Sequence, residues 1–301
     1  MDEFEKLNFI KNGYIQYNNL LDKKNCDEFL KKIYELKNYN KTDLFLSEKE
    51  FLSNPSFEKK NPGKNINNIL LHKDLGLDFI LKNEKINQVI SKILGDNFSI
   101  DLSKIVMGVP DQWIPKWIKK KLSLMGSSNN LNPFLKKKFR DVTCYYGAEY
   151  HQDSIDYSGS KALKSKTFIV MYIYFSDVSE TDAPIYILPT SHVYGAQKFP
   201  HEIDYKDNKI FYSPDNKRKV GLNEVKLTGN AGSVFFWHSL LLHKTTIVKN
   251  SKPRISLKVV IEKNLENKGL IDLIDEKISK ELILENPLKK DWRSKTSNSV
   301  S

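Results

Sequence analysis

The spacing of apolar residues changes along the chain, from helical in the first third to strand-like in the middle. Residues 14–37 predict a short strand followed by an amphipathic helix, because apolar side chains recur there at helical intervals. Residues 40–70 are polar, with Asn and Pro, and predict a loop with a short helix. Residues 76–94 predict another helix. The first helical stripe consists of Leu21, Cys26, Phe29, Leu30, Ile33 and Leu36.

Between about residues 97 and 261 the pattern is that of a β protein. Short apolar runs alternate there with Gly, Pro, Asn, Asp and Ser, interrupted by long insertions around 111–137 and 193–224. This spacing favours a sandwich or barrel over strands that alternate with helices. We expect one domain over residues 1–301: a helical region (1–96) packed on a β core (97–263), then a C-terminal helix and polar tail (264–301).

Composition supports a folded protein outside the membrane. The chain is 40% hydrophobic and 11% aromatic over 301 residues, enough for a sizeable core. Its apolar runs are shorter than the roughly 18 to 20 residues that a spanning helix needs. The acidic N-terminus lacks the pattern of a secretory signal, so we expect a cytoplasmic protein. Two cysteines, Cys26 and Cys144, are too few for a disulfide framework and lack the paired spacing of a zinc site.

The net charge of +11 favours an anionic partner without identifying it. Basic residues cluster at 113–121, where Trp113 and Trp117 accompany four lysines, and again at 136–140. The first cluster is either a patch for a membrane surface or an anionic substrate, or an ordinary solvated helix. Nucleic-acid binding is disfavoured, because the residues between the aromatics of the predicted strands are apolar and suit a core.

Candidate chemistry begins with His151 and Asp153. They are two residues apart at the end of a Tyr-rich run, and in a strand this spacing places both side chains on one face. His243 follows a later apolar strand. Two histidines and one carboxylate form the facial arrangement that holds non-haem iron(II) and leaves positions open. On its own the H-x-D spacing is weak, since the chain has six histidines.

Arg254 strengthens this hypothesis. It lies eleven residues after His243 and begins an alternating strand in which Ser256 shares its face. A guanidinium beside a hydroxyl is suited to capture of a carboxylate that enters the protein interior. An ordinary arginine at a strand end is the alternative, and the combination with the two histidines and the aspartate favours a carboxylate site.

Several segments together resemble the phytanoyl-CoA dioxygenase family of 2-oxoglutarate oxygenases. They are GYIQYNNLLDKKNCDEF, YHQDSIDY, FSDVSETDAPIYILPTSH and GNAGSVFFWHSLLLHKTTIVKNSKPRISL, which span most of residues 13–261. The resemblance implies a double-stranded β-helix (jelly roll, cupin-like) core, mainly β with flanking helices. It implies Fe(II) bound by His151, Asp153 and His243, with 2-oxoglutarate and O2 as co-substrates.

By the same resemblance, Arg254 and Ser256 would bind the distal carboxylate of 2-oxoglutarate, and Tyr172 would lie against it. We expect His192 and His238, which match recurrent positions of the family, to be structural. Relatives that halogenate lack the carboxylate ligand, so Asp153 favours hydroxylation with release of succinate and CO2. The two insertions are expected to cover the substrate.

Two other functions remain open at this point. The chain could be an inactive jelly-roll module that binds a ligand or partner, although such a module has no need of a complete ligand set. A metal hydrolase would need an additional general base and would not need Arg254. The substrate is expected to be a small molecule, lipid or glycan, and the basic surface favours an anionic one.

Overall fold

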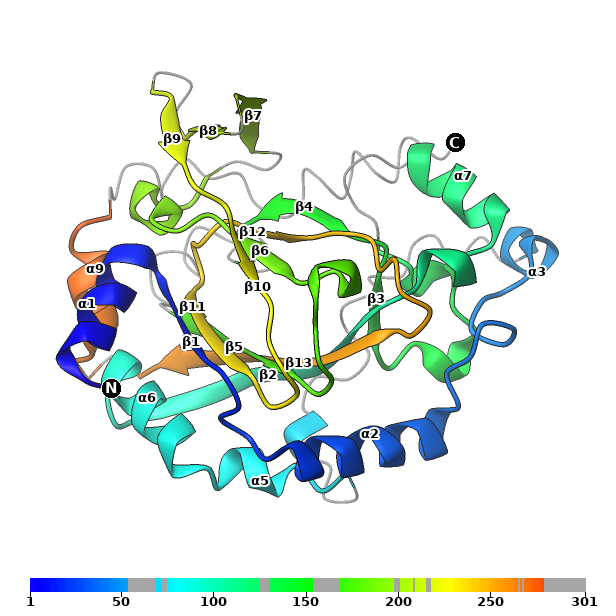
Figure 1. Ribbon diagram of the computed structural model, residues 1–301, viewed down its shortest axis with the longest axis horizontal. Helices are drawn as coiled ribbons and strands as arrows, with labels where there is room; N and C mark the ends of the chain where they lie inside the picture. Colours follow the sequence, from blue (N-terminus) through cyan, green and yellow to red (C-terminus); the bar gives the residue numbers. More distant parts are fainter. Residues whose placement is uncertain are drawn as a thin grey trace.

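The computed structural model describes residues 1–53, 69–71, 75–124, 130–153, 168–197, 201–207, 209–214, 218–264, 266 and 268–278. Two β-sheets form the centre of the molecule (Figure 1). The larger has six strands, antiparallel except for the parallel β2–β3 pair, in the order β1 (Tyr14–Tyr17), β11 (Val234–His238), β5 (Phe168–Tyr174), β13 (Arg254–Lys263), β2 (Phe98–Gly108) and β3 (Thr143–Tyr145). The smaller has four antiparallel strands, in the order β10 (Val225–Leu227), β6 (Ile185–Ile187), β12 (His243–Thr245) and β4 (Ala148–His151).

Strand β5 shows how the larger sheet is buried on both faces. All seven of its residues are buried. Val170 and Tyr172 pack with Ile185 and Ile187 of the smaller sheet, whereas Ile169 and Met171 belong to the core on the opposite side. Side chains alternate between the faces of a strand, so a continuous apolar run fits a central strand covered twice. The two facing sheets confirm the predicted mainly β fold with flanking helices and a jelly-roll core.

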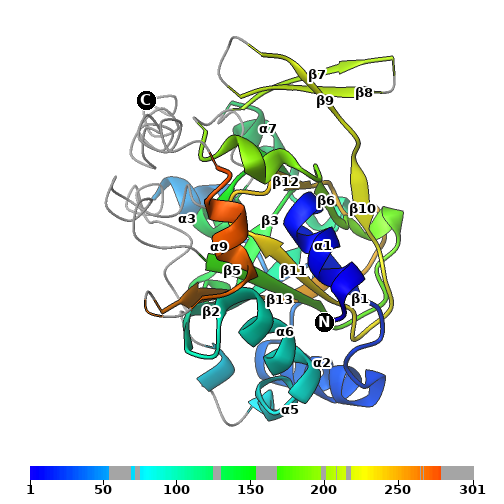
Figure 2. The same cartoon turned by 90° about the vertical axis from the view of Figure 1, so that its left-hand side faces the viewer.

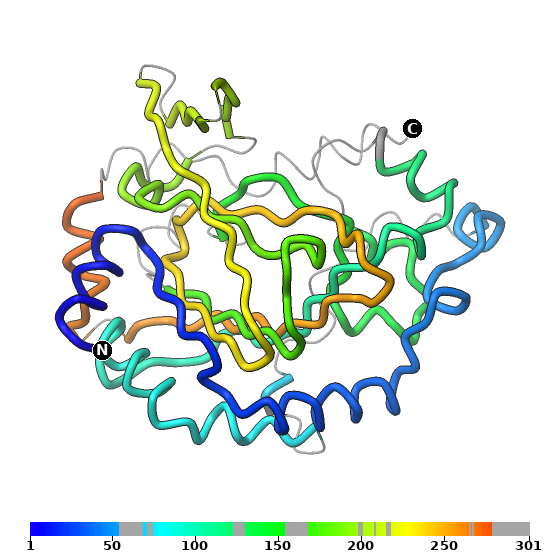
Figure 3. Tube along the Cα trace, in the orientation of Figure 1, coloured from blue at the N-terminus to red at the C-terminus, as the bar shows by residue number. Residues whose placement is uncertain are grey.

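Helices cover the outer face of the larger sheet. The chain starts with α1 (Glu3–Asn12), passes along the sheet edge as β1 and then runs beneath the sheet as α2 (Lys23–Lys37), beside α5 (Asp78–Leu81) and α6 (Glu84–Leu94) (Figures 2 and 3). Helix α6 buries Ile86, Val89, Ile90, Ile93 and Leu94. Among the described residues before β2, the other elements are α3 (Glu48–Leu52) and the 3₁₀ turn Ile69–Leu71. Part of the predicted loop at 40–70 lies outside the described residues.

The helical predictions were correct except at two points. The strand and helix within 14–37 are confirmed. The helix predicted over 76–94 is two helices, because the Asn83 side chain accepts a hydrogen bond from the Ile86 N–H and caps the start of α6. Helix α1 was not predicted. Asp2 and Glu5 form its capping box, and Phe9 is its buried residue.

The first insertion is helical and packs on the core. It contains the 3₁₀ turn Asp111–Trp113, α7 (Lys116–Leu124) and the 3₁₀ turns Asn132–Phe134 and Lys137–Phe139. Ile118 is fully buried, and the Trp117 ring lies 5.4 Å from that of Phe51 and 5.7 Å from that of Phe134. The apolar side of α7 therefore faces the protein itself, which favours an ordinary solvated helix over a membrane-facing patch.

The second insertion forms a small sheet, which we call the β7–β9 arm. It contains β7 (Glu202–Lys206), β8 (Lys209–Ser213) and β9 (Val220–Leu222) and stands beyond the four-stranded sheet (Figures 1 and 2). The 3₁₀ turns Glu180–Asp182 and Ser191–Tyr194 lie in the connections before it.

The C-terminal segment begins with α9 (Leu270–Asp275), which packs against α1 and α6. The rest of the predicted helix and the polar tail, from residue 279 on, lie outside the described residues. The predicted boundary at 96/97 falls between α6 and β2, and the predicted boundary at 263/264 falls at the end of β13. That these three regions form one domain stays a prediction. Within the described ranges, no helix has the length and apolar character needed to cross a membrane.

Candidate metal centre

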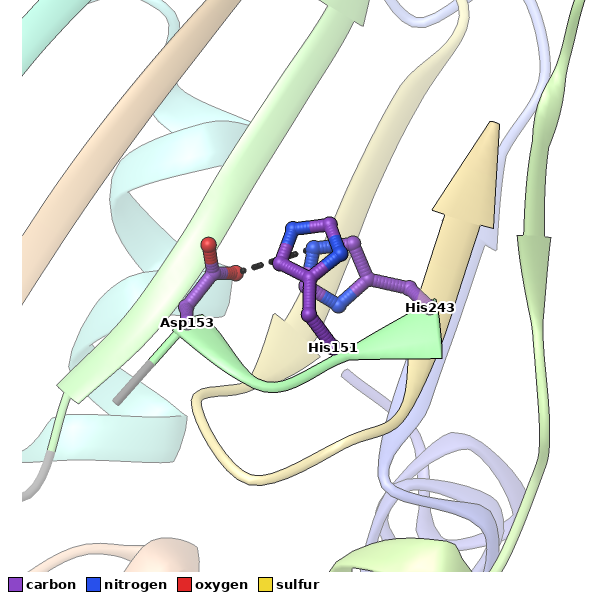
Figure 4. A group of neighbouring side chains, drawn as sticks. All are labelled: His151, Asp153 and His243. Atoms are coloured by element: carbon purple, nitrogen blue, oxygen red, sulfur yellow. Dashed lines mark ion pairs between the residues drawn. The ribbon is translucent and has the colours of Figure 1, made fainter. Parts of the chain in front are cut away.

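Strand pairing in the smaller sheet brings the first three candidate ligands together. His151 ends β4, His243 begins β12, and the two residues are direct partners in the antiparallel register. Asp153 follows two residues after His151 and faces the same point (Figure 4). One ligand atom from each residue lies within 4.8 Å of the others, and His243 Nε2 is 3.5 Å from Asp153 Oδ2. The group has the composition and spacing of a metal site.

Backbone carbonyl groups orient both imidazoles. His151 Nδ1 lies 2.8 Å from the Glu149 carbonyl oxygen, and His243 Nδ1 lies 2.9 Å from that of Leu241. A carbonyl oxygen only accepts hydrogen bonds, so Nδ1 carries the proton in each ring. Nε2 is then the atom with a free lone pair, and this is the usual way in which a protein prepares a histidine ligand.

Asp153 is ionised although it is buried. The Trp237 indole N–H donates to Asp153 Oδ2 at 2.9 Å, and the Lys258 ammonium contacts Oδ1. Burial alone would raise the pKa of this carboxyl, but the charge of Lys258 and the neighbouring imidazoles outweigh it and hold the pKa well below its ordinary value. Burial lowers the pKa of His243 to about 3. A carboxylate and a neutral imidazole are the protonation states that bind a divalent metal.

The residue between the candidate ligands His151 and Asp153 anchors their loop. Gln152 is 1% exposed, and its side-chain amide donates to the carbonyl oxygens of Gly195 and Leu240, both at 2.8 Å. Its side-chain oxygen accepts from the Gln197 N–H at 2.8 Å. The Asp153 N–H donates to the Ser239 carbonyl at 3.0 Å. The loop that carries Asp153 is thus fixed to the two loops beside it.

Arg254 lies in the interior; its charge acts on Asp182, but it forms no salt bridge with a described carboxylate. It is 2% exposed, and its guanidinium donates to the Ala183 carbonyl, to Thr245 Oγ1 at 3.2 Å and to the Tyr172 hydroxyl at 3.4 Å. Among the described residues, no carboxylate forms an ion pair with it, and neither its Nε nor Ser256 Oγ has a hydrogen-bond partner. A buried cation beside unused hydrogen-bonding atoms suits a carboxylate ligand.

Aromatic rings connect Arg254 with the candidate ligands. The Tyr172 ring centroid is 5.5 Å from that of Trp237, which in turn is 5.2 Å from that of His243. Since Trp237 also donates to Asp153, the arginine and the three candidate ligands belong to one interior cluster between the two sheets.

Residues 9–256 match the phytanoyl-CoA dioxygenase (PhyH) family. The chain belongs to this family. The matched residues include all three candidate ligands and Arg254. Comparison with curated proteins gave no match.

Solved structures show the same fold at low identity. The epimerase SnoN, in complex with Fe3+, alpha ketoglutarate and nogalamycin RO, is 14% identical, with a TM-score of 0.54 over 91% of this chain and 88% of that one. EvdO2 from Micromonospora carbonacea var. aurantiaca, complexed with 2-oxoglutarate, is 9% identical, with a TM-score of 0.51 over 90% of this chain and 96% of that one. The non-heme monooxygenase ThoJ is 11% identical, with a TM-score of 0.50 over 86% of this chain and 76% of that one.

The two histidines that we expect to be structural in this family member lie apart from the candidate ligands. His238 Nε2 is 3.3 Å from Asp275 Oδ1 of α9, and the His192 ring is 5.6 Å from that of His238. A Cβ at Gly13, which ends α1 with a φ of +76°, would approach His192 to 2.5 Å. These contacts join α1 and α9 to the sheets.

Gln152, Trp237, Lys258 and His201 are residues near the site that the sequence interpretation missed. Lys258 had a detectable signal, because it stands between Leu257 and Val259 and shares the strand face of Arg254 and Ser256. The part-buried His201, just before β7, had no such signal in the sequence. Burial and the fields of His151 and His243 lower the pKa of His201 to about 3, which places it near the candidate ligands.

One lysine attaches the β7–β9 arm beside these ligands. Lys244 follows His243 in β12, and its ammonium lies 2.7 Å from Glu224 Oε2 and 3.0 Å from the Tyr205 hydroxyl of β7. The same ammonium is 4.5 Å from the centroid of the Tyr150 ring, next to His151. The arm is therefore held at the strands that carry both histidines.

Proposed function

We propose that this protein is an Fe(II)- and 2-oxoglutarate-dependent oxygenase. His151, Asp153 and His243 would hold the iron on one face, and Arg254 with Ser256 would bind the distal carboxylate of 2-oxoglutarate, beside Tyr172. When bound, iron and 2-oxoglutarate supply the oxidising chemistry, with O2 consumed and succinate and CO2 released.

The observation that carries the proposal is that a metal-donor set and a buried arginine lie in one interior. Two oriented imidazoles and an ionised carboxylate converge within 4.8 Å, and the buried arginine forms no salt bridge with a described carboxylate. Iron fits the first group, and a dicarboxylate that binds it could reach the second. In this arrangement the protein orients its ligands and excludes water from the arginine, which strengthens the ion pair that the arginine forms.

The donor set agrees with this choice of metal. Two imidazole nitrogens and one carboxylate oxygen on one face leave further coordination positions for a chelating co-substrate and oxygen. Retention of Asp153 favours hydroxylation, and we propose a small molecule, lipid or glycan as the substrate. A cytoplasmic location remains part of this hypothesis, with the basic segment 113–121 as a solvated helix, because the apolar side of α7 packs on the protein.

An inactive ligand-binding jelly roll is the competing function. Such a module would have no reason to keep a buried, ionised Asp153 with a cation at one oxygen and an indole N–H at the other. It would equally have no reason to keep a buried arginine that lacks an ion-pair partner among the described residues.

Visible absorption of the anaerobic, iron(II)-loaded protein tests the proposal without knowledge of the substrate. Addition of 2-oxoglutarate to wild type is expected to produce a weak metal-to-ligand band. The band should disappear in Asp153→Ala, which loses a ligand, and require far more 2-oxoglutarate in Arg254→Met. Absence of the band in wild type with iron bound would move the inactive module to first place.

A further inference from the structure

Each carboxylate oxygen of Asp153 has its own partner, and one of the two faces the other candidate ligands. Oδ2 lies 3.5 Å from His243 Nε2 and accepts the Trp237 indole N–H at 2.9 Å. Oδ1 contacts the Lys258 ammonium. Figure 4 shows Oδ2 on the line towards His243 and the other oxygen directed away from it. A metal ion between these two residues would therefore meet Oδ2, while Lys258 holds Oδ1.

The number of oxygens that Asp153 supplies to the metal matters for the proposed reaction. Iron(II) in a site of this kind accepts about six donor atoms, and two imidazole nitrogens with one carboxylate oxygen take half of these positions. A co-substrate that chelates the metal takes two more and leaves one for oxygen. A carboxylate can also bind a metal through both of its oxygens. If Asp153 did so, that last position would be filled.

The contact of Lys258 opposes binding through both oxygens. Its ammonium donates to the lone pairs of Oδ1 that a metal would otherwise use, and rotation of the carboxylate towards the metal would break both this contact and the one with Trp237. The side chain of Lys258 is 12% exposed and comes from β13, which is paired on one side with β2 and on the other with β5. An ammonium has three N–H donors, so the contact with Oδ1 leaves donors for other interactions of this lysine.

Placement of the Asp153 loop does not by itself require Lys258. The Gln152 side chain and the Asp153 N–H already fix that loop to its neighbours. Lys258 adds a donor at one oxygen of the carboxylate. Lys263 of the same strand offers a comparison, because its side chain is 11% exposed and its ammonium contacts Asp272 of α9. A contact of that kind stabilises the fold, whereas Lys258 makes its contact with a candidate metal ligand.

We propose that Lys258 is a positioning residue that holds Oδ1 of Asp153 away from the iron, so that the aspartate binds through Oδ2 alone and one coordination position stays open for oxygen. This inference rests on the proposed function and deepens it. The role depends on the contact with Oδ1 and not on the net charge of the site.

Nitric oxide tests this inference, because it binds iron(II) where a coordination position is open and then gives an electron paramagnetic resonance signal. It is titrated anaerobically into protein that is loaded with iron(II) and saturated with 2-oxoglutarate, and the visible band is recorded in parallel. The proteins are wild type, Lys258→Met, Lys258→Arg and the matched control Lys263→Met. Iron is supplied in excess, because loss of a hydrogen bond to a metal ligand also weakens metal binding. Circular dichroism checks that each protein is folded.

Wild type should form the 2-oxoglutarate band and bind nitric oxide. Lys258→Met should keep the band, because both positions for the co-substrate remain. It should bind nitric oxide at least about tenfold more weakly, in the range found when the hydrogen-bond partner of a metal ligand is removed. Lys258→Arg retains a donor that can reach Oδ1 and should stay within about threefold of wild type. Lys263→Met should match wild type in both readouts.

Two outcomes would overturn the inference. Nitric oxide that binds Lys258→Met as tightly as wild type would mean that Oδ1 stays off the metal without the lysine. A folded Lys258→Met protein that takes up no iron, or that loses the band and the nitric oxide signal together, would mean that the lysine only supports metal binding. An iron-loaded wild type without a 2-oxoglutarate band would instead contradict the proposed function, so the two failures are distinguishable.

Discussion

Replacement of Arg254 by methionine removes the guanidinium and keeps much of the apolar stem. In the wild type we expect the guanidinium to form a buried ion pair with the distal carboxylate of 2-oxoglutarate, using the Nε that has no partner among the described residues. Truncation of one partner of such a pair costs about 2–5 kcal/mol. At about 1.4 kcal/mol per factor of ten, the affinity for 2-oxoglutarate should fall between about thirtyfold and a few thousandfold.

The same substitution should leave the ligand-free protein at least as stable. Arg254 donates there to neutral oxygens, at 3.2 Å to Thr245 and 3.4 Å to Tyr172, and its burial without an ion pair is costly. Methionine removes that cost while it gives up weak hydrogen bonds. With iron present, 2-oxoglutarate at 100 times the wild-type dissociation constant should stabilise wild type by about 2.7 kcal/mol, and a variant with hundredfold weaker affinity by about 0.4 kcal/mol.

Urea denaturation with and without 2-oxoglutarate, together with anaerobic titration of the visible band, measures both quantities. Arg140→Met is the matched control, because Arg140 is also buried and donates to the carbonyl oxygens of Leu135 and Pro133. Its 2-oxoglutarate affinity should equal that of wild type. A variant at Arg254 that binds 2-oxoglutarate within threefold of wild type would refute the assignment of this arginine. Loss of several kcal/mol in the ligand-free variant would show that the arginine is mainly structural.

Three further predictions concern other parts of the molecule. Trp237→Phe removes the N–H at Asp153 but keeps a ring, and should weaken iron binding by about 10- to 100-fold in a chelator competition. Burial lowers the pKa of His192 to about 3, so the unfolded chain takes up a proton below about pH 6.5 that the folded protein does not. The contribution of His192 to the free energy of unfolding should therefore decrease as the pH falls from about 6.5 towards 3, by at most about 1.4 kcal/mol per pH unit, and His192→Gln should reduce the slope measured in urea titrations by up to this amount. Lys244→Met breaks the contacts with Glu224 and with Tyr205 of β7, and should make the β7–β9 arm more sensitive to limited proteolysis, with the cleavage sites between residues 202 and 222; an unchanged cleavage pattern would contradict its role in attaching the arm.

The spacing of residues along the sequence was sufficient to predict which candidate residues share a face when those residues are close together in the chain. The H-x-D spacing predicted that His151 and Asp153 converge, which they do although Asp153 lies just beyond β4, and the alternation after Arg254 predicted that Ser256 shares its face. The long apolar run of β5 and its neighbours predicted a β core. The jelly-roll topology, however, came from the resemblance to a family, since pairing of His151 with His243 joins residues far apart in the chain.

Features that depend on tertiary contacts were not predictable in this way. The sequence pattern around Gln152 does not predict its three side-chain hydrogen bonds, because their partners lie in two loops that are distant in the chain. Helix α1 has one fully buried residue, Phe9, so its apolar pattern is weak and its capping box was the available signal. The division at Asn83 likewise depends on a single side chain that caps a helix in the middle of a continuous apolar stripe.

The three candidate ligands differ in how firmly the fold holds them. His243 belongs to β12, which has neighbours on both sides, and Asp153 is held at both of its oxygens. His151 ends β4, which lies at the edge of the four-stranded sheet among the described strands and pairs with β12 across an irregular register. Amide hydrogen exchange should accordingly be faster in β4 than in β12 before metal is added. Iron would then bind first to the firmly held Asp153 and His243, and binding by His151 would follow. The rate of metal exchange would be limited by movement of the edge strand β4.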